Sequence, residues 1–320
     1  MTRAFVTGIN GQDGSYLAER LLDEGVEVHA LAHTADEPSA FVPTAVVVHH
    51  GDLTDVEGTR ALVRDLAPDE VYNLAAVSSV ARSWEAPDQT AAVNGLGAVG
   101  LLESARQVQE ATGRTVRFVQ ASSAEIFGSP TVSPQDEDTP IRPVNPYGAA
   151  KAYAHLMVDV HRSRGLHAVS AILYNHESPR RPTSFVTRKI TSTVAAIARG
   201  TADRLVLGNL DARRDWGWAP DYVDAVVRAA RADHPRDYVV ATGRSHSVRD
   251  FVAAAFLAAG VDDWEHLVSS DPALVRPVDA TDLAGDATRA RTDLGWEPTV
   301  GFTDLVARMV ESDLQTVSAH

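Results

Sequence analysis

Two residues near the middle of the chain, Tyr147 and Lys151, stand four positions apart at the start of a predicted helix. Side chains at this spacing project from one face of a helix. A tyrosine hydroxyl normally titrates near pH ~10, and a nearby lysine ammonium would favour the phenolate and lower that pKa. Tyr147 could then accept a proton from a substrate hydroxyl. The alternative is a surface tyrosine beside a solvated lysine, which is common at this spacing.

Lysine usage supports the chemical interpretation. The chain has only two lysines, Lys151 and Lys189, and every other strongly basic residue is arginine. A lysine kept in an arginine-using chain suggests a position where arginine will not serve. Two residues are a small sample, so chance is the alternative.

A second group of reactive side chains lies in the segment QASSAEIFG, residues 120–128. It ends a predicted strand, and ligands bind at the carboxyl ends of strands in open α/β sheets. Ser122 and Ser123 could hydrogen-bond a substrate, and Glu125 could remove or deliver a proton. The alternatives are serines that cap a turn and a solvated glutamate.

The residues FVTGINGQDGSYLAERL, at 5–21, predict the element that would serve these groups. An apolar run ends at Thr7, glycines follow at 8, 11 and 14, and an amphipathic run begins at Tyr16. Glycines let backbone amides approach a ligand, and a helix N-terminus attracts a diphosphate. Strand, glycine turn and helix together predict a dinucleotide site. An oxidised nicotinamide held there would add to the lowering of the Tyr147 pKa.

Short apolar strands alternate with helical stretches, which predicts a parallel sheet built from βαβ units. We expect a Rossmann-type, doubly wound α/β fold with a smaller C-terminal α/β substrate-binding lobe. The cofactor domain would span residues 1–173 and the lobe 174–320, with some lobe segments returning to the first domain. The strands are expected at 26–32, 46–49, 70–75, 115–121, 166–173, 205–207 and 238–241. The helices are expected at 55–66, 87–109, 147–162, 185–199, 221–231, 248–259 and 302–314.

Composition excludes several classes of function. The chain has 29 basic and 43 acidic residues, a net charge of −14, which argues against nucleic acid or an anionic membrane as a partner. It has no cysteine, so disulfides, thiolate nucleophiles and cysteine metal sites are impossible. No metal is expected. No apolar, signal-like segment follows Met1, and a cytoplasmic location is expected.

Together these motifs resemble the extended short-chain dehydrogenase/reductase family. Longer runs resemble one branch of it, the GDP-mannose 4,6-dehydratase family: YNHESPRRPTSFVTRKI at 174–190, LGNLDARRDWGWAPDYV at 207–223 and VRPVDATDLAGD at 275–286. With TGINGQDGSYLAE and GDLTD, the similarity extends from the first strand to about Pro298. Runs of this length are specific.

The resemblance implies a mechanism that these residue types can support. Tyr147 would deprotonate the sugar 4-hydroxyl as hydride leaves C4 for the cofactor. The resulting 4-ketone acidifies the C5 proton, which Glu125 would remove. Water would leave from C6 with help from Ser123 and Glu125, and hydride would return to C6. The family usually has threonine at position 123, and serine keeps the hydroxyl while losing the methyl that restricts its rotamer.

The resemblance also assigns binding residues, position by position. For the cofactor these are Gly8, Asn10, Gly11, Gln12, Asp13, Asp52, Leu53, Leu74, Ala75, Ala76, Ser78, Lys151, His176 and Arg181. For the GDP-sugar they are Asn175, Val186, Lys189, Arg214, Arg276 and Asp279. Two arginines and a lysine suit a diphosphate. For Arg213 and Arg214, beside Asp211 and Asp215, the alternative is a surface ion-pair cluster. His176 could instead be a packed structural histidine.

The chain departs from the family at the end of the second strand. The family typically has an arginine pair and a longer basic loop there, which suit the 2′-phosphate of NADP. This chain has Ala32, His33 and Thr34, followed by Asp36 and Glu37, and no arginine lies between Arg20 and Arg60. Family similarity indicates NADP, whereas local chemistry favours NAD or a weakened preference for NADP. The family tetramer uses the same loop, so we expect a homodimer, with a tetramer as the alternative.

Two further hypotheses remain open at this stage. A related enzyme could act on another GDP-sugar, such as GDP-heptose, or could be an epimerase or reductase on the same scaffold. Glu125 beside a hydroxyl favours dehydration, because simple 4-epimerisation or 4-reduction needs no base at C5. A catalytically silent nucleotide-sugar or redox sensor would require loss of a catalytic group, and none is lost here.

Overall fold

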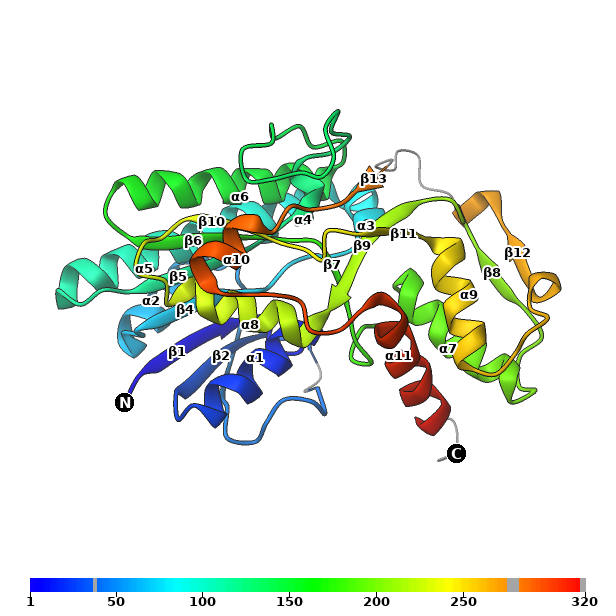
Figure 1. Cartoon of the computed structure of the whole chain (residues 1–320). Helices are drawn as coiled ribbons and strands as arrows, with labels where there is room; N and C mark the ends of the chain where they lie inside the picture. The colour runs from blue at the N-terminus through cyan, green and yellow to red at the C-terminus, as the bar shows by residue number, and fades with distance from the viewer. Residues whose placement is uncertain (37–38, 275–281, 317–320) are drawn as a thin grey trace.

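A seven-stranded parallel sheet forms the centre of the larger part of the molecule (Figure 1). The computed structural model describes residues 1–36, 39–274 and 282–316. In spatial order the strands are β3 (Val47–Gly51), β2 (Glu27–His33), β1 (Arg3–Thr7), β4 (Glu70–Asn73), β5 (Arg117–Ser123), β6 (His167–Leu173) and β10 (Asp237–Val240). Successive apolar residues in β1 are fully buried, as expected for a sheet covered on both faces. The order reverses between β1 and β4, so a ligand crevice opens at their carboxyl ends.

Helices cover both faces of this sheet. Helices α1 (Gln12–Asp23) and α8 (Ala219–Ala230) pack together on one face, where Leu17 and Val226 enter the larger apolar core. Helices α2 (Val56–Leu66), α5 (Ala98–Thr112) and α6 (Pro146–Ser163) cover the other face, where Leu101 and Val158 enter a separate core. The Rossmann-type fold predicted from the sequence is therefore confirmed.

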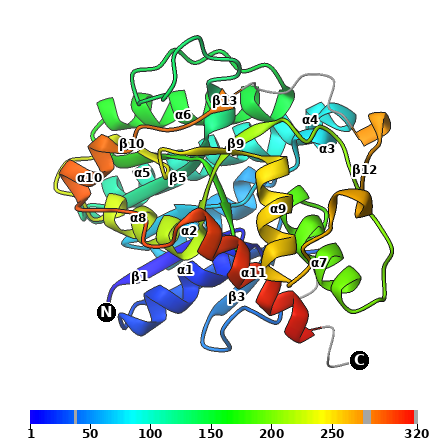
Figure 2. The same cartoon turned by 45° about the vertical axis from the view of Figure 1, so that its right-hand side comes forward.

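A smaller second body lies beside the carboxyl ends of the strands (Figures 1 and 2). Its central strand β9 (Arg213–Trp218) contacts β7 (Asn175–Glu177), β11 (Ser245–Ser247) and β13 (Asp282–Leu283), while β8 (Leu205–Leu207) pairs with β12 (Val268–Ser270). Helices α7 (Val186–Ala198), α9 (Val248–Ala258) and α11 (Phe302–Thr316) enclose its own apolar core, which includes Trp216. Among the described residues, no helix combines the length and apolarity that crossing a bilayer requires.

Parts of the chain after residue 173 pack back on the large sheet. Strand β10 extends the sheet beside β6, helix α8 covers one face, and α10 (Thr288–Leu294) packs against both of them. The expected division at residue 173, with returning segments, stays a prediction about how the two parts behave as domains.

The predicted strands and helices are found, with two corrections. The helix expected at 87–109 is interrupted: α4 (Pro87–Ala91) leads into a π-helical segment, Ala92–Gly97, before α5, and short α3 (Val80–Glu85) precedes it. The Asn94 side chain bonds both the N–H and the carbonyl of Val77, which ties the segment to the loop after β4. Strand β4 ends at Asn73 rather than Ala75, because the Ala75 N–H turns to donate to the Thr7 hydroxyl.

Candidate active site

The glycine turn after β1 leaves no room for side chains. Gly8 has φ +77°, and a Cβ there would lie 2.8 Å from the backbone nitrogen of Ala75. A Cβ on Gly14 would lie 2.2 Å from the carbonyl oxygen of Gly8. The turn therefore brings bare backbone from two strand ends together. Only glycine allows so close an approach.

The helix behind this turn is left open to a ligand. Gly11 is the N-cap of α1, and no side chain caps the helix there. The first amides of the helix and its positive dipole end suit a diphosphate. The predicted cofactor residues Leu74, Ala75, Ala76 and Ser78 lie in the loop that Asn94 and Thr7 hold beside the turn. The glycine turn, the loop after β4 and the N-terminus of α1 therefore fit a nicotinamide dinucleotide.

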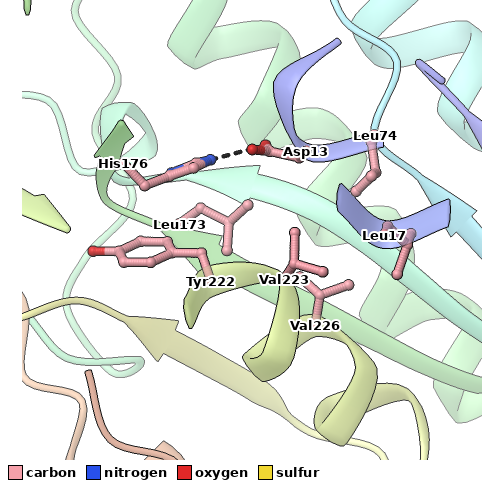
Figure 3. Close-up of a pocket in the computed structure, with 8 residues that line it drawn as sticks. All are labelled: Asp13, Leu17, Leu74, Leu173, His176, Tyr222, Val223 and Val226. Carbon is pink, nitrogen blue, oxygen red and sulfur yellow. Dashed lines mark hydrogen bonds and ion pairs between the residues drawn. The ribbon is translucent and has the colours of Figure 1, made fainter. Parts of the chain in front are cut away.

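Asp13 and His176 join the glycine turn to the segment at β7 (Figure 3). Their Oδ2 and Nε2 atoms lie 2.8 Å apart, and His176 Nδ1 lies 2.7 Å from the Tyr174 carbonyl oxygen. Because both ring nitrogens face acceptors, the contacts favour the charged form of the imidazole. Burial works against this charge, but the Asp13 carboxylate outweighs it and raises the pKa of His176. Burial likewise tends to raise the pKa of Asp13, but His176 lowers it to about 2.

Other side chains and an apolar surface also connect the glycine turn to the β7 segment. Gln12, predicted to bind cofactor, turns inward: it donates to the His176 carbonyl oxygen at 3.1 Å and accepts from the Ser178 hydroxyl at 2.8 Å. The His176 ring stacks on Tyr222 with centroids 4.6 Å apart. Leu74 and Leu173 complete an apolar cavity of about 10 Å³, the space of a single water-sized sphere. The side chains of Gln12 and Asp13 thus hold the turn in place.

Lys151 is buried at the end of β5. Its Nζ donates to the Ala121 carbonyl oxygen at 2.8 Å, and burial lowers its pKa to about 8. The same carbonyl accepts from Gln120, which in turn accepts from Asn73, and Asn73 accepts from Thr7. This buried polar ladder crosses the ends of β1, β4 and β5 and fixes Lys151 relative to the glycine turn.

Tyr147 lies on the first turn of α6, with the Lys151 ammonium 5.9 Å from its ring centroid. Burial raises the pKa of Tyr147 to about 12; a hydrogen bond with Ser123 opposes this and the Glu125 carboxylate reinforces it. The expected lowering of this pKa is therefore wrong for the chain's own groups. The Lys151 ammonium, 5.9 Å from the ring centroid, does not outweigh burial. The lowering requires the added positive charge of an oxidised nicotinamide.

Glu125 is held by a residue that the sequence analysis missed. Its Oε2 accepts a hydrogen bond of 2.7 Å from Asn145 Nδ2, and Asn145 Oδ1 accepts from the Gly148 N–H at 2.7 Å. Asn145 is the N-cap of α6, and Pro146 follows it. An Asn-Pro pair before a helix is a capping signal, but nothing local indicates that the cap also reaches Glu125. Ser123, the N-cap of the 3₁₀ turn Ala124–Ile126, accepts from the Glu125 N–H.

The far end of the predicted cofactor site, after β2 and β3, is more open. The predicted contact Asp52 is half-exposed, with its Oδ2 3.6 Å from His33 Nε2, and Leu53 is buried behind it. Asn10 accepts from the Ser39 N–H and reaches the Asp36 carboxylate at 3.5 Å. Negative charge therefore lies beside the glycine turn. Glu37 is outside the described residues.

The predicted sugar-nucleotide residues lie on the smaller body. Asn175 is on β7 beside Trp216 of β9, the strand that also carries the buried Arg214. Val186 and Lys189 are on the first turn of α7. Arg276 and Asp279 are outside the described residues.

Arg181, predicted to bind cofactor, lies between the predicted cofactor residues and the predicted sugar-nucleotide residues. It stacks on Phe185, with its guanidinium carbon 3.8 Å from the ring centroid, and pairs with Glu177. It is within electrostatic reach of Asp13, His176 and Tyr147. The structure thus gathers the predicted catalytic and cofactor residues at one edge of the sheet, with the described substrate residues on the strands and helix of the smaller body.

Known proteins resemble this chain along nearly its whole length. The family described as "GDP-mannose 4,6 dehydratase" matches residues 5–309. GDP-mannose 4,6 dehydratase 1 of Arabidopsis thaliana is 45% identical, over 98% of this chain and 90% of that protein. GDP-mannose 4,6 dehydratase of Homo sapiens is 41% identical, over 99% and 92%. Among solved structures, the UDP-glucose 4-epimerase of Thermus thermophilus in complex with NAD has a TM-score of 0.86 and 30% identity, covering 98% of this chain and 99% of that one.

Proposed function

The chain belongs to the GDP-mannose 4,6-dehydratase family of nicotinamide-dependent enzymes, and from this premise we propose that it converts GDP-mannose to GDP-4-keto-6-deoxymannose. The observation that carries the proposal is the cluster of Ser123, Glu125 and Tyr147 beside Lys151 at the carboxyl end of β5. Dehydration needs a base for an acidic carbon in addition to a base for a hydroxyl, and this cluster has both.

Each side chain takes a role that its contacts support. A nicotinamide dinucleotide held on the glycine turn would supply a hydride acceptor for C4 and a hydride donor for C6. Tyr147 takes the proton of the 4-hydroxyl, with Ser123 hydrogen-bonded to it. Lys151 is fixed by the Ala121 carbonyl and lies on the same helix face, where its positive charge stabilises the phenolate.

Glu125 performs the elimination. Once C4 is a ketone, the C5 proton is acidic, and the Glu125 carboxylate removes it. The same group, now protonated, returns the proton to the oxygen leaving C6, which departs as water. Ser123 lies beside Glu125 through its bond to the Glu125 N–H and assists the departure. One base thus serves both halves of the elimination. When hydride returns to C6, C5 must take up a proton, and the proton that Tyr147 took from the 4-hydroxyl balances it, so no net external proton is consumed.

The GDP-sugar would lie between the strand ends and the smaller body. Asn175 and Arg214 approach from adjacent strands, and Val186 and Lys189 from the start of α7. Lys189 and the arginines supply the positive charge that a diphosphate needs. The family resemblance adds Arg276 and Asp279 to this set.

The cofactor is a nicotinamide dinucleotide. The protein should discriminate only weakly between a 2′-phosphate and a 2′-hydroxyl on its adenosine ribose. Asp36 places a carboxylate beside Asn10, and His33 faces Asp52 at the strand end where the family resemblance implies an arginine pair. Losing one or two charge-assisted contacts of roughly 1.5–3 kcal/mol shifts selectivity by about one to three decades. We therefore expect a smaller preference for NADP than in relatives with the arginine pair, or a preference for NAD. Calorimetric titration with each dinucleotide tests this, and a hundredfold preference for NADP would contradict it.

The protein should act as a homodimer in the cytoplasm. The outer face of α6 exposes Tyr153, Leu156 and Val160, and Leu96 is exposed on the neighbouring π-helical segment. This apolar stripe suits pairing with a second copy of the chain. Sedimentation analysis should show a dimer that Leu156→Glu converts to monomers. A tetramer that persists in this variant would refute the pairing.

The decisive experiment is mass spectrometry of GDP-mannose incubated with purified protein. Loss of one water supports the proposal. An unchanged mass with an altered sugar would indicate an epimerase, and conversion of GDP-heptose alone would indicate the related dehydratase. Binding without any conversion would indicate a sensor.

A further inference from the structure

The N-cap of α6 makes a second contact that helix formation does not require. Asn145 accepts from the Gly148 N–H through Oδ1, which is the ordinary capping bond. With Oδ1 committed in this way, its Nδ2 faces the Glu125 carboxylate at 2.7 Å. The capping bond thereby fixes the orientation of the amide, so the donor toward Glu125 is assigned by the network. The Asn145 side chain is buried.

The backbone brings the same two elements into contact. A Cβ on Gly148 would lie 2.5 Å from the Glu125 carbonyl oxygen, so the first turn of α6 rests directly on the Glu125 backbone. Pro146 favours the extended conformation of Asn145, φ −144° and ψ 160°, which an N-cap adopts. Tyr147 is the next residue of this turn. One short segment therefore carries Tyr147 and holds Glu125.

From these contacts we propose that Asn145 is a positioning residue for Glu125, an inference that rests on the proposed dehydration. It holds Oε2 in place through the 2.7 Å hydrogen bond from Nδ2. Oε1 has no hydrogen-bond partner among the described residues, so it is the atom free to take the C5 proton. Asn145 thus acts on elimination through Glu125 and leaves oxidation at C4 to Tyr147.

Two substitutions separate this role from capping. Asp and Ser both cap helices well, so Asn145→Asp and Asn145→Ser should preserve folding. Asp has no donor and puts a second negative charge against Glu125, whereas the Ser hydroxyl is one bond shorter. We expect Asn145→Asp to slow elimination about 100-fold and Asn145→Ser about 10-fold, with C4 oxidation changed by less than about twofold.

Single-turnover measurements with GDP-mannose follow both steps. Absorbance of the reduced nicotinamide reports C4 oxidation, and mass spectrometry reports loss of water. In the variants the reduced cofactor should accumulate before water is lost, with kcat lowered and KM nearly unchanged. Ser247→Ala, which removes the capping box of α9 away from this site, should lower thermal stability without such accumulation. Equal slowing of both steps, or an unchanged elimination rate, would overturn the inference.

A measurement without turnover tests the contact itself. In isotope-labelled protein, the Asn145 side-chain amide signals should be protected from hydrogen exchange, and Glu125→Ala should remove that protection. If the wild-type protein does not dehydrate GDP-mannose, the proposed function fails. This measurement then still decides the contact: exchange that is equally fast with and without the Glu125 carboxylate refutes it.

Discussion

The strand ends on the two sides of the switch point are built very differently. On the β1–β4–β5 side, Gly8, Lys151 and Asn145 are surrounded by backbone and buried hydrogen bonds, with no space to spare. On the β2–β3 side, His33, Asp36 and Asp52 are exposed or half-exposed. The His33–Asp52 and Asn10–Asp36 contacts are 3.6 and 3.5 Å long, and the shorter bonds of His33 and Asp52 come from the local Ala35 and Thr54 N–H groups. Hydride chemistry needs atoms fixed within fractions of an ångström, whereas recognition of the adenosine end needs only suitable charge. We infer that cofactor preference can change in this chain without disturbing its catalytic side.

The largest effect is expected from the two proposed bases on the buried side. Tyr147→Phe should block all hydride chemistry, whereas Glu125→Gln should still form reduced cofactor transiently. Each should lower overall turnover by about 10²–10⁴-fold, the usual range for a lost general base. Stopped-flow absorbance with product analysis distinguishes them. Normal product at a near-normal rate from Glu125→Gln would show that another group removes the C5 proton.

The next effect concerns the space at the glycine turn, for which the chain offers a matched control. Gly8 and Gly25 have nearly the same φ, +77° and +76°, but a Cβ on Gly25 would meet nothing within 4 Å. Gly25→Ala should cost about 1–2 kcal/mol of stability for the positive φ alone and leave cofactor binding intact. Gly8→Ala should lose cofactor affinity about 100-fold in addition, because Ala75 and the turn must move apart. Thermal unfolding and calorimetric titration measure both. Equal behaviour of the two variants would show that the turn is not as tight as described.

A smaller effect is expected at the joint between the buried side and β7, and it depends on pH. The pKa of His176 is raised above 6.5, so its contribution to stability is full below that pH and is lost as pH rises through the folded-state value. The pKa of Asp13 is lowered from 3.8 to about 2, so its contribution is full above 3.8 and lost as pH falls toward 2. The pair should therefore stabilise the fold most between these limits.

Comparison with His176→Gln checks this. Wild type should be more stable than the variant near pH ~5, and the gap should shrink as pH rises above 6.5 through the folded-state pKa of His176. The exposed His234 offers a control, since His234→Gln removes an imidazole from the surface, away from Asp13 and Tyr222. A gap between wild type and His176→Gln that stays constant with pH would mean that packing on Tyr222, and not charge, explains the role of His176.

The smallest effect is expected on the open side. Asp36→Asn removes an exposed negative charge beside Asn10 and should raise NADP affinity relative to NAD by about threefold to tenfold, as for a screened charge interaction. The exposed Asp65 on α2 offers a control for net charge, and Asp65→Asn should leave the ratio unchanged. Titration of both variants with both dinucleotides measures the ratio. A loss of stability in Asp36→Asn would remove the contrast between the two sides.

The sequence by itself determined the strands of the large sheet and their order along the chain, because these depend on local patterns, whereas it did not predict β7, β9, β11, β12 and β13 of the smaller body. The glycines at 8, 11 and 14 between an apolar and an amphipathic run specified strand, turn and helix, and the Tyr147–Lys151 spacing specified one helix face. Even β8, at Leu205–Leu207, lies where its short apolar run predicts a strand. Long motifs then identified the family, since runs of that length do not match by chance.

Only the tertiary structure decided which groups meet and what their charges become. Asn145 and Glu125 are 20 positions apart, and His176 and Asp13 are 163 apart. No periodicity encodes such contacts, because they depend on how strands far apart in the chain are ordered in the sheet. The pKa of Tyr147 likewise depends on tertiary packing. Its neighbours in sequence suggested a lower value, but burial in the assembled fold raises it to about 12, since the cost of a buried charge depends on everything packed around it.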